Sequence, residues 1–359
     1  MSTSDSALAR PVFGLRVLER RLPGLIRSVA PTGVWVLLDR KVEAVIGKPL
    51  RAALAKTGVP HRVFPFTAHE RNKSLAQLEA LAGRFLRAGA DRGGLILGVG
   101  GGITTDVAGF LAATLMRGCS WGALPTTLLG MADAAIGGKT AVNLPEGKNL
   151  LGAFHQPRFV LADIASLRTL PDREWGCGLG EVIKSGMTAS PALLRRIEQT
   201  PPRAIRRAGD QALALAKGAA AVKVRIVAAD PLEGGQRKLL NLGHTFGHAL
   251  ETSAGPRKLA HGEAVGLGLL CATQMAVATG RARPAYADQV EKLLLRCGLP
   301  TRFPGKLPSR AELTRLIARD KKKAGSTVDV ILPIRPGRCE ILPGQAPRDL
   351  ARVMFDTLG

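Results

Sequence analysis

The chain has 359 residues, of which 46% are hydrophobic and 4% aromatic, and this length predicts two folded domains rather than one core. Its formal net charge of +23, from 51 basic and 28 acidic residues, would by itself suggest nucleic-acid binding. The basic residues are spread along the chain, however, and one Tyr and three Trp leave little aromatic surface for base stacking. We therefore expect no nucleic-acid partner and instead a site for an anionic small molecule.

The cysteines and the first residues of the chain indicate the cellular compartment of the protein. The five cysteines form no CxxC pair, and their odd number is typical of a reducing compartment with incidental thiols. The first six residues, MSTSDS, contain no basic region followed by an apolar run, and no apolar run reaches the length of a bilayer span. These features predict a cytoplasmic protein that makes no contact with a membrane.

Short apolar strands and helical patterns alternate in the first half of the chain. Residues 34–38 predict a buried strand that ends at Asp39, and residues 61–66 predict a second strand. Ser74 is then a candidate N-cap of a helix. The apolar positions of that helix follow the helical period at Leu75, Leu78, Leu81, Phe85 and Leu86.

Two more strands are predicted in this half, at residues 95–99 and 159–162. The first of them leads into a glycine run, and we expect the following helix to begin near Thr104 or Thr105. Strands that alternate with helices in this way indicate a parallel sheet.

The pattern changes beyond about residue 173. Long helical segments rich in Ala and Leu are predicted at 211–228 and 264–279, and only residues 328–332 still have the pattern of a strand. The sequence therefore predicts an α/β domain followed by a mainly α-helical domain. The boundary is expected near residues 170–172.

A glycine-rich turn, Gly98-Val99-Gly100-Gly101-Gly102, lies between a predicted strand and a predicted helix. Glycine there allows the backbone to approach a pyrophosphate, and the helix N-terminus favours negative charge. The spacing is not GxGxxG, and such a turn is often only a turn. Asp106 just inside the helix, and a second cluster at Thr126-Thr127 after another strand, strengthen the prediction of a dinucleotide site.

Residues 133–149 form a second glycine-rich stretch. Gly-Gly-Lys-Thr at 137–140 resembles the end of a P-loop, but Asp133 stands where the first glycine should be, which argues against a nucleoside triphosphatase. Two lysines and an asparagine in these loops could donate to phosphate or carboxylate oxygens. A solvated basic loop fits this stretch equally well.

Half of the six histidines fall between residues 241 and 261. His244 and His248 are four residues apart and would share one face of a helix, which is the spacing of a metal-binding pair. There is no HExxH motif, so the general base of a metalloprotease is lacking. This window predicts a metal enzyme of another class.

Charged residues precede the histidines along the chain. Glu181 and Lys184 lie one helical turn apart, which by itself is usually a surface ion pair. A further row of polar residues follows along the chain. Such a row is commonly a solvated helix face, but this one leads directly to the histidines between residues 241 and 261, which favours a functional role. Its members are Lys223, Asp230, Glu233, Arg237 and Asn241.

Five motifs in fixed order carry a resemblance to a known family. They read GGGITTDVAGFLAATLMRG, PTTLLGMADAAIGGKTAVNLPEGKNLLGAF, SLRTLPDRE, GEVIKSG and LLNLGHTFGHALE with HGEAV. On these motifs the chain resembles the 3-dehydroquinate synthases, which are sugar-phosphate cyclases, over about residues 34–334. The resemblance implies an α/β N-terminal Rossmann-like domain that binds NAD, at residues 1–172, and a mainly α-helical C-terminal domain for metal and substrate, at 173–359. It also implies a homodimer.

The resemblance further implies the reaction. The family substrate is 3-deoxy-D-arabino-heptulosonate 7-phosphate, and the products are 3-dehydroquinate and phosphate. NAD oxidises one hydroxyl transiently, phosphate is eliminated, the ketone is reduced, and the ring opens and closes again as a carbocycle. The substrate phosphate is thought to take the proton in the elimination.

Metal and substrate residues are also implied by the resemblance. It assigns Zn²⁺ or Co²⁺ to Glu181, His244 and His261, so that His248 is not a ligand but lies near the substrate phosphate. Arg117 matches an arginine that crosses the dimer interface, and Lys322 is the best match to a late lysine. The complete substrate and catalytic set is Arg117, Asp133, Lys139, Asn149, Lys184, Lys223, Glu233, Arg237, Asn241, His248 and Lys322.

The expected cofactor is NAD rather than NADP, because Asp39 at the end of an early strand suits a ribose diol and disfavours a 2′-phosphate. The positions that match NAD contacts are Asp39, Glu70, Lys73, Gly100, Gly101, Gly102, Asp106, Thr126, Thr127, Lys139, Lys148 and Thr169. The chain departs from residues common in the family, which bears on cofactor affinity more than on the reaction. The departures are Lys41, His69, Ala134, Ala135 and Pro231.

Related activities remain as alternatives at this point. The retained cations favour a substrate with a carboxylate, so the amino-analogue cyclase is harder to exclude than relatives that cyclise sedoheptulose 7-phosphate or glucose 6-phosphate. A metal-dependent polyol dehydrogenase of the glycerol dehydrogenase type is less favoured, as is a nucleic-acid-binding protein without activity.

Overall fold

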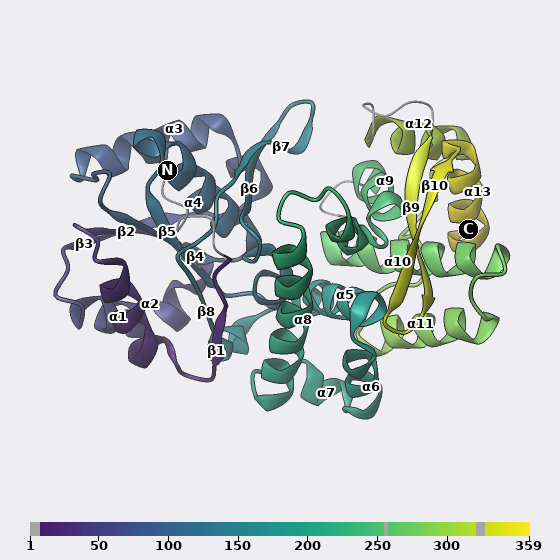
Figure 1. The fold of residues 1–359 in the computed structure, drawn as a ribbon, viewed down its shortest axis with the longest axis horizontal. Coiled ribbons are helices and arrows are strands. Elements are labelled where there is room, and N and C mark those ends of the chain that lie inside the picture. The colour runs from purple at the N-terminus through teal and green to yellow at the C-terminus, as the bar shows by residue number, and fades with distance from the viewer. Residues whose placement is uncertain (1–7, 255–257, 321–326) are drawn as a thin grey trace. The chain divides into compact units, whose positions relative to one another are not determined.

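The computed structural model describes residues 8–254, 258–320 and 327–359 (Figure 1). The chain forms two compact units. The first comprises Met1–Leu170 together with Arg207–Ala220, and the second comprises Pro171–Arg206 together with Ala221–Gly359. No helix among the described residues is both long enough and apolar enough to cross a membrane.

A six-stranded sheet forms the centre of the first unit, and all of its strand pairs are parallel. This confirms the predicted parallel sheet and each of the strands expected in the first half. The edge strand β1 was not predicted, because three residues are too few to show a pattern. In sheet order the strands are β1 (Val12–Gly14), β8 (Phe159–Asp163), β5 (Ser120–Pro125), β4 (Leu95–Gly100), β2 (Val34–Asp39) and β3 (His61–Phe66).

Helices cover both faces of this sheet. They are α1 (Leu18–Val29), α2 (Glu43–Ala55), α3 (Leu75–Arg87) and α4 (Gly102–Thr114). Because side chains alternate along a strand, Trp35 and Leu37 of β2 join a core with α3 and α4. Val36 and Leu38 point the other way, into a core with α1 and α2. Every residue of β2 is therefore buried, as in a sheet covered on both faces.

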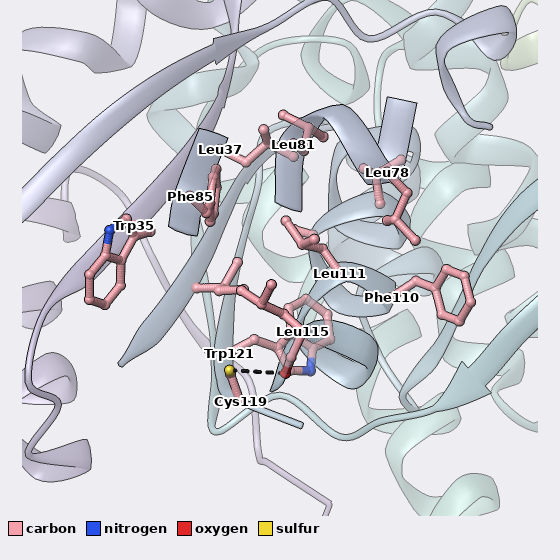
Figure 2. Packing of buried hydrophobic residues seen from close by; sticks show 14 of the residues in the cluster. Trp35, Leu37, Leu78, Leu81, Phe85, Phe110, Leu111, Leu115, Cys119 and Trp121 are labelled. Carbon is pink, nitrogen blue, oxygen red and sulfur yellow. Dashed lines mark hydrogen bonds between the residues drawn. The ribbon is translucent and has the colours of Figure 1, made fainter. Parts of the chain in front are cut away.

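Figure 2 shows the first of these cores, in which Leu78, Leu81 and Phe85 of α3 lie near Leu111 of α4. Ser74 caps α3 as expected, since its Oγ accepts a hydrogen bond from the Gln77 N–H at 3.3 Å. The other two apolar positions expected on this helix lie outside the core. Leu75 and Leu86 are each 45% exposed, because they stand at the margins of the narrow stripe that packs.

Helix α4 begins at Gly102, earlier than the Thr104 or Thr105 expected from the sequence. The hydroxyl of Thr105 donates to the Gly102 carbonyl at 3.0 Å within the first turn, so it does not act as an N-cap. Gly101 is the N-cap residue. The glycine run therefore supplies the first turn of the helix as well as the turn before it.

Residues expected to form glycine-rich loops instead form a hairpin of β6 (Lys139–Leu144) and β7 (Gly147–Phe154). Thr140 and Val142 are β-branched residues that favour strands, and both are buried. Asp133 lies just before the hairpin in a short helical turn, Gly130–Ala134. The interpretation of this stretch as a solvated loop is wrong for β6.

The second unit is mainly helical, as predicted, with α5 (Asp172–Ala189) and α10 (His261–Ala278) among its buried helices. Its other helices are α6 (Pro191–Gln199), α7 (Pro202–Ile205), α9 (His244–Ala254), α11 (Pro284–Arg296), α12 (Arg310–Asp320) and α13 (Pro347–Leu358). Helix α8 (Asp210–Ala229) contributes residues to both units. The expected helices at 211–228 and 264–279 are thus confirmed, with slightly different ends.

Among its described residues, the second unit holds two strands where one was expected. Val328–Arg335 (β9) pairs antiparallel with Arg338–Gln345 (β10). The second strand was missed because its residues are mostly exposed or half-buried, and because it contains Pro343 and Gly344. Strands of this kind lack the continuous apolar run that marks a buried strand.

Candidate functional site

The first unit presents a glycine cradle at the carboxyl edge of its sheet. β2, β4 and β5 end in register there, and the Thr126 N–H donates to the Gly100 carbonyl at 2.9 Å. A Cβ on Gly100 would lie 2.5 Å from Thr104 Oγ1, and one on Gly101 would lie 3.1 Å from Thr127 Cγ2. Glycine avoids these contacts and leaves the backbone beside the α4 N-terminus without side chains, as a pyrophosphate site requires.

Polar groups at the same edge fit a dinucleotide. Thr104 Oγ1 and Thr126 Oγ1 are buried, and neither has a hydrogen-bond partner within the described ranges. Asp39 is 5% exposed, and its carboxylate accepts the Lys41 N–H at 3.1 Å. Burial raises the pKa of the Asp39 carboxyl above its usual value, although the hydrogen bond and Lys41 act in the opposite direction. Buried polar atoms without partners are uncommon unless a ligand satisfies them.

Lys73 connects two other predicted site residues in the first unit. Its ammonium lies 2.5 Å from Asp106 Oδ2 and also donates to Asn149 Oδ1. The Asn143 side chain extends this network, because its amide donates to Glu70 Oε2 at 2.7 Å and its oxygen accepts the Asn149 N–H at 3.0 Å. The sequence analysis assigned no role to Asn143. Its position between Lys139 and Asn149, two predicted site residues of the same hairpin, could have identified it.

The remaining predicted residues of the first unit are exposed or half-buried. Lys139, Lys148, Thr169 and Arg117 are exposed, and Thr127 and Asp133 are half-buried. Arg117 has a left-handed backbone, with φ of 66°. For these residues the assigned contacts with NAD or substrate stay predictions.

Three predicted metal ligands meet in the second unit. Glu181 comes from α5, His244 is the first residue of α9, and His261 is the first residue of α10. One ligand atom from each lies within 4.8 Å of the others. Glu181 Oε1 lies 3.8 Å from His244 Nε2 and 3.5 Å from His261 Nε2.

Close packing of glycines brings α5 and α10 together at this point. A Cβ on Gly262 would lie 2.2 Å from Cys177 Cα, and one on Gly180 would lie 2.9 Å from the Gly262 carbonyl oxygen. Both glycines adjoin a candidate ligand, since Gly180 precedes Glu181 and Gly262 follows His261. Their lack of a side chain thus sets the distance between the carboxylate and the imidazole.

An ion pair holds the start of α5 against the start of α10. Arg173 Nε and Nη2 donate to the two carboxylate oxygens of Glu263, at 2.7 and 2.6 Å. Glu263 also accepts the Ala260 N–H at 2.7 Å. Burial alone would raise the pKa of Glu263, but Arg173 and this N–H outweigh it and lower the pKa. The ion pair and this hydrogen bond together fix the backbone before and after His261.

The Glu181 carboxylate is in an unusual position for a buried group. It is 1% exposed and forms an ion pair with Lys184 Nζ at 2.5 Å. Apart from this pair, its oxygens accept no hydrogen bond from the residues described. Burial alone would raise the pKa of Glu181, but Lys184 and the two imidazoles hold it well below its usual range. The interpretation of Glu181 and Lys184 as a surface pair is therefore wrong.

The two histidines differ in protonation without a metal. Burial and the Lys184 ammonium lower the pKa of His244 to about 3, so its imidazole is neutral and can act as a ligand. Burial would also lower the pKa of His261, but the carboxylates of Glu181 and Glu251 raise it to about 10. Binding of a divalent metal by this group would require loss of the His261 proton on Nε2, which faces Glu181. A buried carboxylate with two imidazoles is a ligand set that Zn²⁺ accepts.

His248 lies beside the cluster without belonging to it. Its ring centroid is 5.3 Å from that of His244 and 6.5 Å from that of His261. His244 and His248 share a face of α9, as their spacing predicted. The first hypothesis from spacing, that these two form the metal pair, does not describe the group that the structure brings together.

Three predicted cations of the second unit are buried. Lys184, Lys223 and Arg237 are 2%, 8% and 1% exposed. The Arg237 guanidinium donates to the Pro231 carbonyl, and the Asn241 amide donates to Glu233 Oε1 at 2.8 Å. Cationic side chains of this kind can donate charge-assisted hydrogen bonds to phosphate or carboxylate oxygens of an anionic ligand.

The loop before Arg237 is organised by Asp230. Its carboxylate accepts the N–H groups of Gly234, Gly235 and Arg237 at 2.9, 2.7 and 2.9 Å. These hydrogen bonds lower the pKa of Asp230. The row of polar residues is thus a helix end followed by a turn and not one helix face. Lys322, the late lysine predicted from the resemblance, lies outside the described residues.

Comparison with known proteins assigns a family to the chain. The family model of the 3-dehydroquinate synthase N-terminal domain matches residues 63–177, and that of the C-terminal domain matches residues 178–323. A 3-dehydroquinate synthase of Rhodospirillum rubrum is 44% identical over 358 aligned residues, covering 94% of this chain and 92% of the relative.

Solved structures with a similar fold include two cyclising synthases and, at lower TM-scores of 0.66–0.69, several dehydrogenases. A 2-epi-5-epi-valiolone synthase of Streptomyces hygroscopicus with NAD⁺ and Zn²⁺ bound has a TM-score of 0.89 at 25% identity, covering 99% of this chain and 98% of that one. A 2-deoxy-scyllo-inosose synthase complexed with carbaglucose-6-phosphate, NAD⁺ and Co²⁺ has a TM-score of 0.88 at 24% identity, covering 98% of each. On the family models and the relatives, the chain belongs to the 3-dehydroquinate synthase family.

Proposed function

We infer that the chain is a phosphate-eliminating carbon–oxygen lyase that converts 3-deoxy-D-arabino-heptulosonate 7-phosphate to 3-dehydroquinate, as its curated relatives are named to do. The observation that supports this most strongly is the group formed by Glu181, His244 and His261, with the buried Lys184 paired to Glu181. NAD and a divalent metal, Zn²⁺ or Co²⁺, are its cofactors. When bound, they supply a reversible hydride acceptor and a Lewis acid.

We further propose roles for individual residues of the two domains, 1–172 and 173–359. The glycine cradle with Asp39 and the Lys73 network would bind NAD. Glu181, His244 and His261 would hold the metal, and Lys184, Lys223 and Arg237 would bind the substrate anions. A homodimer in the cytoplasm fits the relatives' activity, and the exposed Arg117 would contribute to the substrate site across the dimer interface.

The experiment that tests the activity is a measurement of phosphate release from 3-deoxy-D-arabino-heptulosonate 7-phosphate, with catalytic NAD and added Zn²⁺, while absorbance reports NADH. Phosphate released over many turnovers without net NADH is the expected result. No release, with release from the amino analogue, would assign the other cyclase activity. Steady accumulation of NADH would indicate a polyol dehydrogenase.

Replacing Arg237 by Ala is expected to raise the KM for this substrate by roughly 30- to 100-fold, with a smaller change in kcat. The buried guanidinium would contribute a charge-assisted hydrogen bond of about 2–3 kcal/mol, and one factor of ten corresponds to about 1.4 kcal/mol. Steady-state kinetics would measure the change. Arg281→Ala removes an exposed arginine of the same unit and should leave KM unchanged. An unaltered KM in a folded Arg237→Ala protein would rule out this role.

Replacing Lys73 by Met is expected to weaken NAD binding about tenfold, or about 1.4 kcal/mol. The change removes the cation that neutralises Asp106, so an uncompensated carboxylate would face the phosphates near the α4 N-terminus. Calorimetry would give the Kd. The double variant Lys73→Met with Asp106→Asn should recover much of the affinity, and Lys56→Met serves as an exposed control. Equal affinity of the single and double variants would contradict the charge argument.

A further inference from the structure

Glu251 is a largely buried glutamate next to the metal-binding group, and neither the sequence analysis nor the family resemblance gave it a role. Its side chain is 11% exposed, and its Oε2 lies 3.3 Å from His261 Nδ1. It stands on α9, seven residues after His244, and therefore on the same helix face. One helix thus supplies a candidate ligand and a contact to a second candidate ligand on α10.

The two nitrogens of the His261 ring face different carboxylates. Nδ1 faces Glu251, whereas Nε2 faces Glu181 Oε1 at 3.5 Å. When Nδ1–H donates to Glu251, the lone pair of Nε2 is directed toward the Glu181 side. The contact with Glu251 therefore selects the tautomer in which Nε2 is the ligand atom.

His244 has the same arrangement with a different acceptor. Its Nδ1 lies 3.2 Å from the Leu242 carbonyl oxygen, and its Nε2 faces Glu181 Oε1. Both candidate ligands thus have Nδ1 anchored and Nε2 directed inward. The anchor of His244 is a neutral backbone group, but that of His261 is a carboxylate. A carboxylate makes the imidazole a stronger electron donor to a metal than a carbonyl does.

A positioning contact has particular value for His261. Its side chain is 35% exposed, compared with 15% for His244 and 1% for Glu181. A partly exposed ring is held by fewer packing contacts, so a hydrogen bond contributes more to its orientation. His261 is also the first residue of its helix, where backbone restraint comes from one side only.

We propose that Glu251 is a positioning residue that orients His261 and strengthens its bond to the metal. The proposal rests on the metal centre of the proposed function. Glu251 does not touch substrate or NAD in this assignment. Its loss should therefore act first on metal affinity and only through the metal on turnover.

The test is the zinc dissociation constant of the full chain, measured by competition with a chromophoric chelator. Glu251→Ala is expected to weaken zinc binding about 10- to 100-fold, the usual effect of removing an outer-shell partner. Glu251→Gln retains an acceptor for Nδ1–H but loses the charge, so its dissociation constant should lie between those of Glu251→Ala and the wild type. Glu291→Ala, at an exposed glutamate of the same unit, should leave the constant unchanged.

A second readout separates positioning from general stability. In the Co²⁺-substituted protein, loss of Glu251 should shift the visible absorption of the metal, whereas a merely structural ion pair would alter only the thermal transition. Zinc affinity within about twofold of the wild type in the folded Glu251→Ala variant would overturn the proposal. Absence of zinc binding by the wild type would instead overturn the metal centre itself.

Discussion

Replacing Glu181 by Gln is expected to reduce zinc-dependent turnover about a thousandfold while NAD binding is retained. The amide cannot supply an anionic ligand between His244 and His261, and a catalytic metal contributes several kcal/mol to transition-state stabilisation. A loss of about 4 kcal/mol corresponds to roughly three factors of ten. Phosphate release, zinc content and the Kd for NAD would be measured on the same preparation.

Stability must be followed with this variant, because the change also removes the carboxylate paired with Lys184. Breaking a buried pair by altering one partner costs about 3–5 kcal/mol. His261→Ala provides a second route to the same result without altering that pair. Glu174→Gln, on the exposed part of the same helix, is the matched control. Full zinc-dependent turnover in either Glu181→Gln or His261→Ala would refute the ligand assignment.

Replacing Gly262 by Ala is expected to abolish zinc binding and to lower the free energy of unfolding by about 3 kcal/mol. The added Cβ would lie 2.2 Å from Cys177 Cα and 2.3 Å from the Cys177 carbonyl oxygen, which are backbone atoms of α5. Carbon atoms in contact are separated by about 3.5 Å, so the helices would have to move apart by roughly 1 Å. Zinc–ligand distances tolerate only about 0.2 Å.

Chelator competition and thermal denaturation would measure both effects of Gly262→Ala. The matched control is Gly176→Ala on α5, where the nearest atom to the added Cβ lies at 3.6 Å, an ordinary contact distance. This control should be neutral or slightly stabilising, because Ala favours helix over Gly by about 0.5–1 kcal/mol. Unchanged zinc affinity in Gly262→Ala would show that the close approach of the two helices does not set the ligand distances.

The fold could be predicted where the sequence pattern reflects burial. The strands β2, β4 and β8 are continuous apolar runs, and they were found because both faces of the sheet are covered. The strand β10 could not be found this way, because it is an exposed edge partner of a two-stranded sheet. Its pairing with β9 depends on the turn between them and not on apolar periodicity.

The candidate site shows more clearly that the spacing of residues in the sequence does not predict which residues meet in the fold. The separation of His244 and His248 correctly predicted a shared helix face, but the structure groups His244 with His261 and with Glu181, which is 63 residues earlier in the chain. No local period links α5 with α10, because their contact depends on tertiary packing at Gly180 and Gly262. The resemblance carried by the family motifs supplied this grouping. It assigned no role to Glu251 or Asn143.

The division of α8 between the two units has a consequence for folding during synthesis. Residues 207–220 belong with the first unit, although 36 residues of the second unit, Pro171–Arg206, are made before them. The first unit therefore lacks part of its structure until residue 220 has left the ribosome. A fragment that ends at residue 172 would expose the surface that 207–220 otherwise cover, and we expect such a fragment to aggregate or to be degraded.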